Sequence, residues 1–436
     1  MQLCFFSDSK GQRFDPLTLT RPVHDLRVGI YTIQEKWEKW LKTSMNSHLS
    51  RHYLTEVFPS QTPSQGDACL WVNARVLPNE KLIQEVIELP IGVALVADSK
   101  DSSNESIVSA ESTSPALSSQ QDVLAIKLTD QQSIKEHQNH YVLTSENSGF
   151  EFLSSAISTT QKSKSEVKVV DYLWDLLQFN GEEITTDLTL IEVPTVEDHE
   201  LRSNLHVMHP ENIFIHPTAH LEPGVILVAE EGPIYIGANA TIEAGSILKG
   251  PLAVCASSVT KMGCRIYGGT TIGPVSKVGG EVSNTIFHSY SNKAHDGYMG
   301  NSLVGQWCNM GADSNTSNLK TNYGLIYLDD WNTQKPYSIG FQFFGSVLGD
   351  HSKTAINAML NTGTMCGVCS NIFLSQFTPK YIPSFSWLTD HGNSIYRFEK
   401  AIEAMRAMMA RRKITFTEAY EKMMRHLLDQ QMNSHS

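Results

Sequence analysis

Apolar residues recur at every sixth position through the second half of the chain, from Ile213 to Phe373. A period of six fits neither an α-helix nor an ordinary strand, and a fixed internal repeat is typical of a solenoid. Three short strands would form one triangular turn, and each turn would hydrogen-bond to its neighbours through the backbone. The pattern therefore predicts a hexapeptide-repeat β-solenoid over residues 205–375. The in-phase positions are Ile236, Ile242, Leu248, Val254, Ile266, Ile272 and Val278.

The repeat is interrupted twice, and a stretch with apolar residues at helical spacing follows it. A short delay occurs at residues 229–233, and a longer loop at residues 317–344 carries several aromatic side chains. The register resumes at Leu348. Helical patterning over residues 394–430 predicts C-terminal helices, whose methionine-rich stripe would pack on the solenoid or on a neighbouring subunit.

The first 200 residues combine strand-like and helix-like stretches and predict a separate α/β domain. The predicted strands are 3–6, 68–72 and 92–97, and the predicted helices are 30–41 and 78–89. Such an alternation favours a largely parallel sheet. Because ligands bind at the carboxyl ends of parallel strands, the loop at residues 7–16 is a candidate site.

The link between the two predicted domains is less regular. Residues 101–121 are rich in serine and predict a flexible surface excursion. A helix is predicted over residues 170–179, ending at the C-cap pair Asn180 and Gly181. Residues 182–204 would then connect to the solenoid.

Composition narrows the class of protein. The net charge of −12, without a basic stripe, argues against a nucleic-acid partner. The seven scattered cysteines suit reduced thiols, and Cys366 and Cys369 fall inside the hexad register as small apolar fillers. The sequence contains neither a run of membrane-spanning length nor a basic N-terminal region. We therefore expect a cytoplasmic protein without a membrane partner.

One polar segment of the solenoid could carry chemistry. Residues 291–300 contain lysine, histidine and tyrosine, and asparagine-rich residues 309–318 follow one turn later. An imidazole can remove a proton from an attacking amine at neutral pH. The alternative is that His295 and the asparagines only satisfy backbone groups at the corners. Spacing alone leaves both interpretations open.

The hexads and this segment resemble the acetyltransferase domain of the bifunctional N-acetylglucosamine-1-phosphate uridyltransferase/glucosamine-1-phosphate N-acetyltransferase family. The whole chain resembles a divergent branch of it, with an Asp-Ser-Lys-Gly-Gln-Arg-Phe loop and a Leu-Thr-Leu-Thr-Arg-Pro-Val run near the N-terminus. The resemblance implies a left-handed parallel β-helix, an exception to the usual right-handed crossover. It also implies a homotrimer with active sites between coils at subunit interfaces.

The family's Lys-Ala-Gly-His-x-x-Tyr motif falls on residues 293–298, with one residue deleted before the histidine. The resemblance makes His295 the general base, which takes the proton as the sugar amine attacks the acetyl thioester. It places Lys293 in the substrate site and Tyr298 at the sugar phosphate.

The next coil supplies further contacts implied by the resemblance. The Asn-x-Gly-Ala element makes Asn309 a sugar contact and Ala312 an acetyl-CoA contact. Asn318 corresponds to an asparagine on the acetyl-CoA side, and Arg265 to a phosphate ligand. The chain departs from the family at Asp313, where glycine is usual, and in the long loop at residues 317–344.

At the N-terminus the resemblance is to sugar nucleotidyltransferases, whose Leu-x-x-Gly-x-Gly-Thr-Arg loop wraps nucleotide phosphates. This chain keeps Gly11 and Arg13 and lacks the first glycine. Lys10 and Arg21 complete the nucleotide-binding residues that we assign. Arg13, Arg21, Asp25 and Arg27 could also form a substitute site.

The family's metal-binding Gly-Asp reads Asn73 and Ala74 in this chain. Nucleotidyl transfer depends on a magnesium bridge, so Mg²⁺ is a possible cofactor of this domain, but the sequence assigns no metal ligands. Asp8 could be a ligand or a turn-former.

We therefore expect an enzyme of amino-sugar nucleotide metabolism that uses acetyl-CoA to acetylate an amino-sugar 1-phosphate, with glucosamine 1-phosphate as the first choice. A uridyltransferase step to UDP-N-acetylglucosamine would follow. One alternative is a nucleotidyltransferase whose β-helix is only a trimerising scaffold. Another is a non-catalytic protein that binds sugar nucleotides. The cluster of Lys293, His295 and Tyr298 favours acetyl transfer over a bare scaffold.

Overall fold

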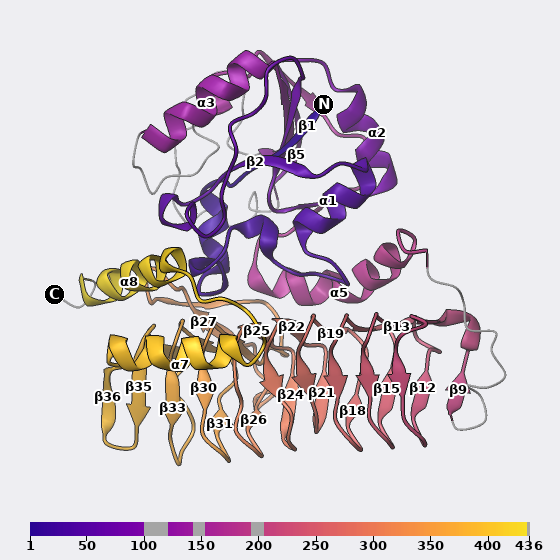
Figure 1. Ribbon diagram of the computed structural model, residues 1–436, viewed down its shortest axis with the longest axis vertical. Coiled ribbons are helices and arrows are strands. Elements are labelled where there is room, and N and C mark those ends of the chain that lie inside the picture. The colour runs from indigo at the N-terminus through magenta and orange to yellow at the C-terminus, as the bar shows by residue number, and fades with distance from the viewer. Residues whose placement is uncertain (100–120, 143–152, 193–204, 434–436) are drawn as a thin grey trace. The chain divides into compact units, whose positions relative to one another are not determined.

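The computed structural model describes residues 1–99, 121–142, 153–192 and 205–433 (Figure 1). The chain divides into two compact units. The first consists of Met1–Gln12, Arg21–Leu26 and Thr32–Asp171, and the second of Arg13–Thr20, Arg27–Tyr31 and Tyr172–Ser436. Of the excursion expected at residues 101–121, only Gln121 is among the described residues.

The first unit is built on a six-stranded sheet in the order β2-β1-β3-β6-β5-β7. Strand β1 pairs in parallel with β2 and β3, and β5 with β7, whereas β6 runs antiparallel to β3 and β5. The strands are β1 (Gln2–Phe6), β2 (Met45–Leu49), β3 (Cys69–Asn73), β5 (Val93–Asp98), β6 (Gln121–Leu128) and β7 (Thr159–Lys162), and β4 (Val76–Leu77) pairs separately with β8 (Lys168–Val169). The helices are α1 (Ile33–Leu41), α2 (Glu80–Glu88) and α3 (Asp130–Val142).

The predicted α/β class and the predicted strands and helices of the first 100 residues are confirmed. The sheet is mixed because of β6, which the sequence did not reveal. Strand β6 follows the serine-rich stretch and is apolar without alternation, since Val123, Leu124, Ala125 and Ile126 are all buried. Such a run carries no periodic signal for a strand.

A group of buried histidines lies in the first unit: His24, His48, His137 and His140. The rings of His24 and His48 lie 5.0 Å apart. Burial lowers the pKa of each of these histidines, and it lowers the pKa values of His48 and His137 to about 4. Neutral imidazoles are therefore part of the folded state of this unit.

The hexads of the second unit fold as the predicted left-handed parallel β-helix, whose coils stack in succession (Figure 1). Every in-phase position named from the sequence is at most 1% exposed, so the predicted register is confirmed. The first face is a nine-stranded sheet. Its strands are β10 (Ile213–Ile215), β13 (Ile234–Ile236), β16 (Leu252–Val254), β19 (Thr270–Ile272), β22 (Ile286–Ser289), β25 (Leu303–Gln306), β29 (Ser346–Leu348), β32 (Thr364–Cys366) and β34 (Tyr381–Ile382).

The second and third faces complete the triangle. The second face contains β11 (His220–Leu221), β14 (Thr241–Ile242), β17 (Val259–Thr260), β20 (Lys277–Val278) and β23 (Asn292–Lys293), and further along β30 (Lys353–Thr354), β33 (Asn371–Phe373), β35 (Ser386–Thr389) and β36 (Gly392–Ile395). The third face contains β9 (His206–Met208), β12 (Ile226–Val228), β15 (Ile247–Lys249), β18 (Arg265–Ile266), β21 (Glu281–Ser283) and β24 (Tyr298–Gly300), with the pair β26 (Asn315–Thr316) and β31 (Met359–Leu360) beyond them.

Helix α5 (Leu173–Leu188) packs on the first face, and here the predicted helix end is wrong. The helix continues through Asn180 and Gly181 because tertiary contacts hold Asn180. The Asn180 side chain accepts a hydrogen bond from the Gly29 amide (2.7 Å) and donates one to the Gly269 carbonyl (2.8 Å). Local capping propensity is overridden by these buried contacts.

The loop at residues 317–344 forms a hairpin of β27 (Tyr327–Asp329) and β28 (Pro336–Ser338). Trp331 of the hairpin contacts Tyr381 of β34 with ring centroids 5.0 Å apart. The chain ends in α7 (Phe398–Ala410) and α8 (Glu418–Asn433), which confirms the predicted C-terminal helices. Among the helices in the described ranges, none is long and apolar enough to cross a membrane.

We predict that acid unfolds the first unit. Because folding lowers the pKa of the buried histidines, the unfolded state binds more protons, and stability is lost as the pH falls from about 6.5 toward about 4. Each histidine that takes up a proton on unfolding should contribute a slope of about 1.4 kcal/mol per pH unit. Hydrogen exchange of the full chain, read on peptides from β1 and β2, measures this slope.

The matched variants are His48→Gln and His220→Gln. The first should reduce the slope, whereas the second, at an exposed histidine of the solenoid, should leave it unchanged. A slope that persists in His48→Gln and in His137→Gln would show that other groups cause the acid sensitivity.

Candidate functional site

His295 lies at an exposed corner between the second and third faces of the solenoid, on the connection from β23 to β24. Gly297 makes this corner possible with a φ of +111°. A Cβ atom at Gly297 would lie 2.3 Å from the Ser314 carbonyl oxygen of the next coil, so only glycine fits. The imidazole is thus held on a rigid turn and faces solvent.

Asp313 occupies the corresponding corner one coil later. Its φ of 56° lies in the left-handed region, and its amide donates to the Asp296 carbonyl over 3.0 Å. Aspartate is among the few residues other than glycine that tolerate this conformation. The departure from the family at this position therefore keeps the turn.

Lys293 supports the corner from inside. Its side chain takes an interior position, in register with Val278 of the preceding coil, and is 1% exposed. The amine donates to the carbonyls of Gly279 (3.1 Å) and His295 (3.0 Å). Burial lowers the pKa of Lys293 to about 8. The structure thus places this amine against the backbone of His295.

Arg265, Tyr298 and Asn318 come together on the third face. Arg265, Glu281 and Tyr298 are neighbours in register on β18, β21 and β24. The Arg265 guanidinium pairs with Glu281 at 3.1 Å, and the Asn318 amide donates to the Tyr298 hydroxyl (3.0 Å). Burial raises the pKa of Tyr298. Glu281 was missed from the sequence, although the coil repeat would have placed it beside Arg265.

Asn309 lies on the second face, where Asn292, Asn309 and Lys353 bridge in succession. The Asn292 amide donates to the Asn309 side-chain oxygen over 2.8 Å. Ala312 precedes the corner at Asp313, and its carbonyl accepts a hydrogen bond from the Asn357 amide (2.8 Å). Of the residues predicted for acetyl transfer, the structure therefore sets Asn309 on one side of the His295 corner and Tyr298 on the other.

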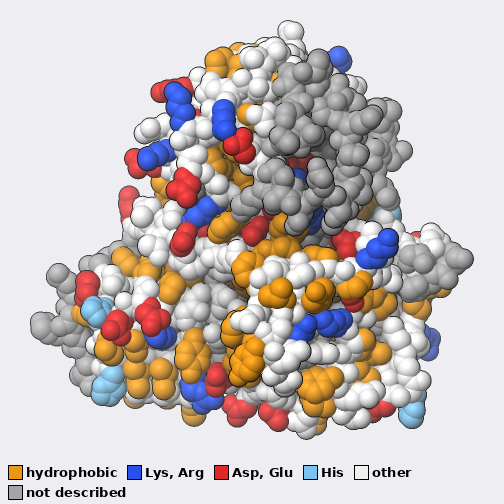
Figure 2. Space-filling model, turned by 180° about the vertical axis from the view of Figure 1, so that it is seen from behind, with side chains coloured by type: hydrophobic (Ala, Val, Ile, Leu, Met, Phe, Trp, Pro, Cys, Tyr) orange, Lys and Arg blue, Asp and Glu red, His pale blue; other side chains and the backbone are white. Residues whose placement is uncertain are grey.

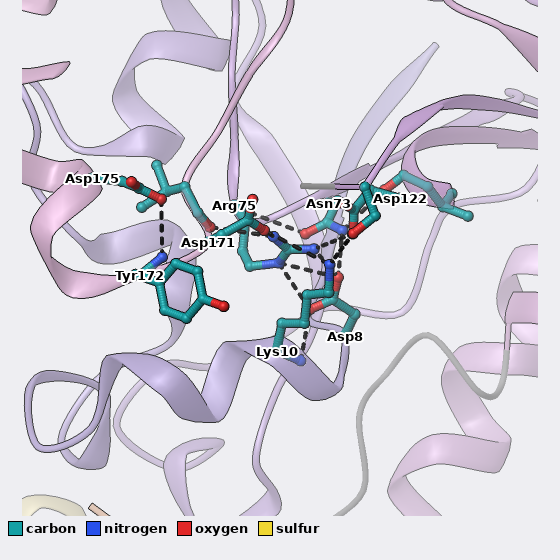
Figure 3. A network of polar contacts seen from close by, with 11 residues as sticks. Asp8, Lys10, Asn73, Arg75, Asp122, Asp171, Tyr172 and Asp175 are labelled. Carbon is teal, nitrogen blue, oxygen red and sulfur yellow. Dashed lines mark hydrogen bonds and ion pairs between the residues drawn. The ribbon is translucent and has the colours of Figure 1, made fainter. Parts of the chain in front are cut away.

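A second polar cluster lies in the first unit, at the carboxyl-end edge of the sheet (Figure 3). Asp8 follows β1, Asn73 ends β3, and Asp122 lies at the start of the antiparallel β6. Arg75 is fully buried among them. Its guanidinium contacts both oxygens of Asp8 (2.5 to 3.1 Å), Asp122 (2.9 Å) and Asp171 (2.5 Å).

Lys10 completes this cluster. Its amine donates to Asp122 (2.9 Å) and to the Ser99 hydroxyl (2.8 Å). Burial alone would raise the pKa of Asp8, but Arg75, Asn73 and Lys10 together outweigh it and hold that pKa below its usual value. Burial alone would lower the pKa of Arg75, and the aspartates more than reverse this effect. Asp8 and Arg75 are therefore both ionised at neutral pH.

The other residues predicted for nucleotide binding also lie against other parts of the chain. A Cβ atom at Gly11 would lie 3.2 Å from Val23. Arg21 is buried and pairs with Asp25 at 3.3 Å. In the second unit, Arg13 lies over the Tyr172 ring (4.8 Å to the centroid). Arg27, also in the second unit, donates to the His288 carbonyl (3.0 Å).

Sequence reasoning missed Arg75, Asp122 and Asp171. The family's metal-binding Gly-Asp falls on Asn73 and Ala74, and Arg75 follows directly. The available signal was a charged residue directly after a buried strand, and an arginine in such a place needs buried carboxylates as partners.

Comparison with known proteins agrees with this architecture. Residues 3–194 match the family model described as "Sugar nucleotidyl transferase". The N-terminal region is a sugar nucleotidyltransferase-like domain. The Bifunctional protein GlmU of Rippkaea orientalis (strain PCC 8801 / RF-1) is 26% identical over 143 residues, which covers 28% of this chain and 32% of that protein. The resemblance to the bifunctional family is confirmed, although the match spans only 32% of this relative's length.

Two solved structures are similar to parts of the chain. The polysialic acid O-acetyltransferase OatWY shares 10% identity over 44% of this chain and 86% of its own, with a TM-score of 0.25. The N-acyltransferase AntD from Bacillus cereus, in complex with dTDP and 3-hydroxybutyryl-CoA, shares 12% identity over 48% of this chain and 91% of its own, with a TM-score of 0.20. Scores this low establish no likeness in function.

We predict that Gly297→Ala destabilises the β-helix strongly. The substitution combines a positive φ with a clash against the next coil, so it should lower the free energy of unfolding by about 3 kcal/mol. Gly245→Ala is the matched control, because Gly245 has a φ of +70° and no atom within 4 Å of an added Cβ. It should cost only about 1 kcal/mol. Urea unfolding measures both, and equal losses would contradict the close approach.

Proposed function

We propose that the β-helix transfers an acetyl group from acetyl-CoA to the amine of an amino-sugar 1-phosphate, with glucosamine 1-phosphate as the first candidate. One observation carries the proposal: an exposed histidine stands on a rigid corner between two polar faces. Asn292 and Asn309 line one side of this corner, and Tyr298 and Asn318 line the other. The family resemblance supplies the reaction.

In this reaction the amine nitrogen attacks the thioester carbonyl, and the imidazole of His295 takes the amine proton. The carbon–sulfur bond then breaks and the amide remains on the sugar. The CoA thiolate takes the proton from the His295 imidazolium and leaves as a thiol. Tyr298 and Asn309 would orient the sugar, and Ala312 and Asn318 would contact acetyl-CoA. The interior amine of Lys293 positions the His295 backbone and does not reach solvent.

Arg265 is the proposed phosphate ligand. Its guanidinium is exposed and already pairs with Glu281. An exposed pair of this kind is worth about 0–1 kcal/mol, so a phosphate dianion can compete with the carboxylate for the arginine. Glu281 would then keep Arg265 oriented when no substrate is bound.

We further propose that the enzyme works in the cytosol as a homotrimer. Large hydrophobic side chains are exposed on the 317–344 loop and the following coils, among them Tyr323 (67%), Phe343 (51%), Ile356 (67%) and Phe377 (59%). Figure 2 shows hydrophobic side chains gathered over the solenoid. Exposed apolar surface of this kind favours contact between subunits.

A second candidate function is the binding of a sugar nucleotide by the N-terminal domain, which its family match favours. The magnesium ion that uridyl transfer would need does not fit the residues present. Asp8 and Asp122 are bonded to Arg75, and the position after β3 offers Asn73 and Ala74. We therefore derive no uridyl transfer step for this domain.

We predict that His295→Ala lowers kcat for thiol release from acetyl-CoA and glucosamine 1-phosphate by at least about 100-fold, the contribution typical of a general base. His220→Ala is the matched control, since His220 is another exposed histidine of the second face. It should retain full activity. An unchanged rate in His295→Ala would remove His295 from the mechanism.

The same protein should be offered N-acetylglucosamine 1-phosphate, UTP and Mg²⁺ while pyrophosphate is followed. Pyrophosphate without thiol release would favour the nucleotidyltransferase with a scaffold β-helix. Binding of UDP-sugars without either product would favour the non-catalytic interpretation.

A further inference from the structure

We propose that Arg75 is the built-in cation of the strand-end site in the N-terminal domain. Its guanidinium holds Asp8, Asp122 and Asp171 together, so this site takes no divalent metal ion. The proposal concerns the metal that the sugar nucleotidyl transferase family implies, and it does not depend on acetyl transfer by the β-helix.

The guanidinium is saturated by fixed acceptors. Its Nε donates to both oxygens of Asp8, Nη2 donates to Asp8 and Asp122, and Nη1 donates to Asp171 and to the Val170 carbonyl. An arginine has five N–H groups in a planar fork, and acceptors surround all three nitrogens here. Figure 3 shows these bonds converging on Arg75 from several elements.

Two of the three carboxylates also accept hydrogen bonds from other side chains. Asp8 also accepts a hydrogen bond from the Asn73 amide nitrogen (2.9 Å), and Asp122 also accepts one from the Lys10 amine (2.9 Å). Magnesium requires oxygen ligands at about 2.0–2.1 Å in octahedral geometry. The guanidinium occupies the centre that such an ion would need, and a dication beside a buried arginine would be repelled.

Asn73 also donates a hydrogen bond to the cluster and offers it no negative charge. Its side-chain nitrogen faces Asp8 and the Val123 carbonyl, and its side-chain oxygen accepts from the Arg75 amide (3.1 Å). The residue therefore supplies a hydrogen-bond donor to the aspartate where a metal site would supply a further anionic oxygen. Three aspartates against Arg75 and Lys10 leave one net negative charge, which is a small imbalance for a buried cluster.

The test uses Mn²⁺ as the probe on the full chain. Electron paramagnetic resonance should detect no bound Mn²⁺ on the wild type up to about 1 mM, and EDTA should shift its thermal midpoint by less than about 1 °C. Arg75→Ala removes the cation between the three carboxylates, which then repel one another. We expect this variant to melt at least about 5 °C lower and to regain several degrees in Mn²⁺.

Arg21→Ala is the matched control, because Arg21 is also a buried arginine of the first unit and pairs with Asp25. It should lose stability without regaining it in Mn²⁺. Should Arg75→Ala fail to fold, Arg75→Lys retains a cation at the site and should bind no Mn²⁺.

Two outcomes would overturn the proposal. One is a wild type that binds Mn²⁺ with a Kd below about 100 μM, weakened at least about tenfold by Asp8→Asn or Asp122→Asn. The other is a folded Arg75→Ala that Mn²⁺ stabilises no more than Arg21→Ala, because the carboxylates would then form no cation site. This test does not measure thiol release. A failure of the proposal for Arg75 can therefore be distinguished from a failure of the proposed acetyl transfer.

Discussion

The stacking of coils by backbone hydrogen bonds is the constraint on which the solenoid depends. Each short strand must pair with its equivalent one coil before and one coil after, so the interior is narrow and the corners recur in rows. Most interior residues are therefore apolar, and many are small or branched, as Ile242 and Val278 are. Corners need positive φ, which Gly297 and Asp313 provide. The exposed position of His295 is a direct result of these two requirements.

The same constraint explains how much could be predicted. The hexads between Ile236 and Val278 gave the register because consecutive coils there are regular. The next coil is shorter, since Val278 pairs with Lys293. Continuing the phase by eighteen residues, as from Thr260 to Val278, would have missed Lys293 as an interior side chain. The motif assigns Lys293 to the substrate site, and its hydrogen bonds direct the amine to the backbone carbonyls of Gly279 and His295.

Other features depend on contacts between residues far apart in sequence. The end of α5 was mispredicted because Asn180 and Gly181 form a good local cap signal, while the bonds of Asn180 to Gly29 and Gly269 keep the helix going. The Arg75 cluster draws its carboxylates from positions 8, 122 and 171. No local pattern links such positions, and only the sheet order brings them to one edge.

Both polar clusters show cations used to hold the chain in place. Lys293 and Arg75 are buried and directed at fixed acceptors, and to release either one for a ligand would leave a carbonyl or a carboxylate unpaired in the interior. Such a loss costs about 1–3 kcal/mol for a neutral group and more for a charged one. Ligand chemistry must therefore fall to groups at the surface. In the solenoid the groups that we propose for this chemistry are the imidazole of His295 and the guanidinium of Arg265, whose half-buried partner Glu281 a phosphate would replace at little cost. The buried cations hold the chain in position, and exposed cations remain available to bind ligands.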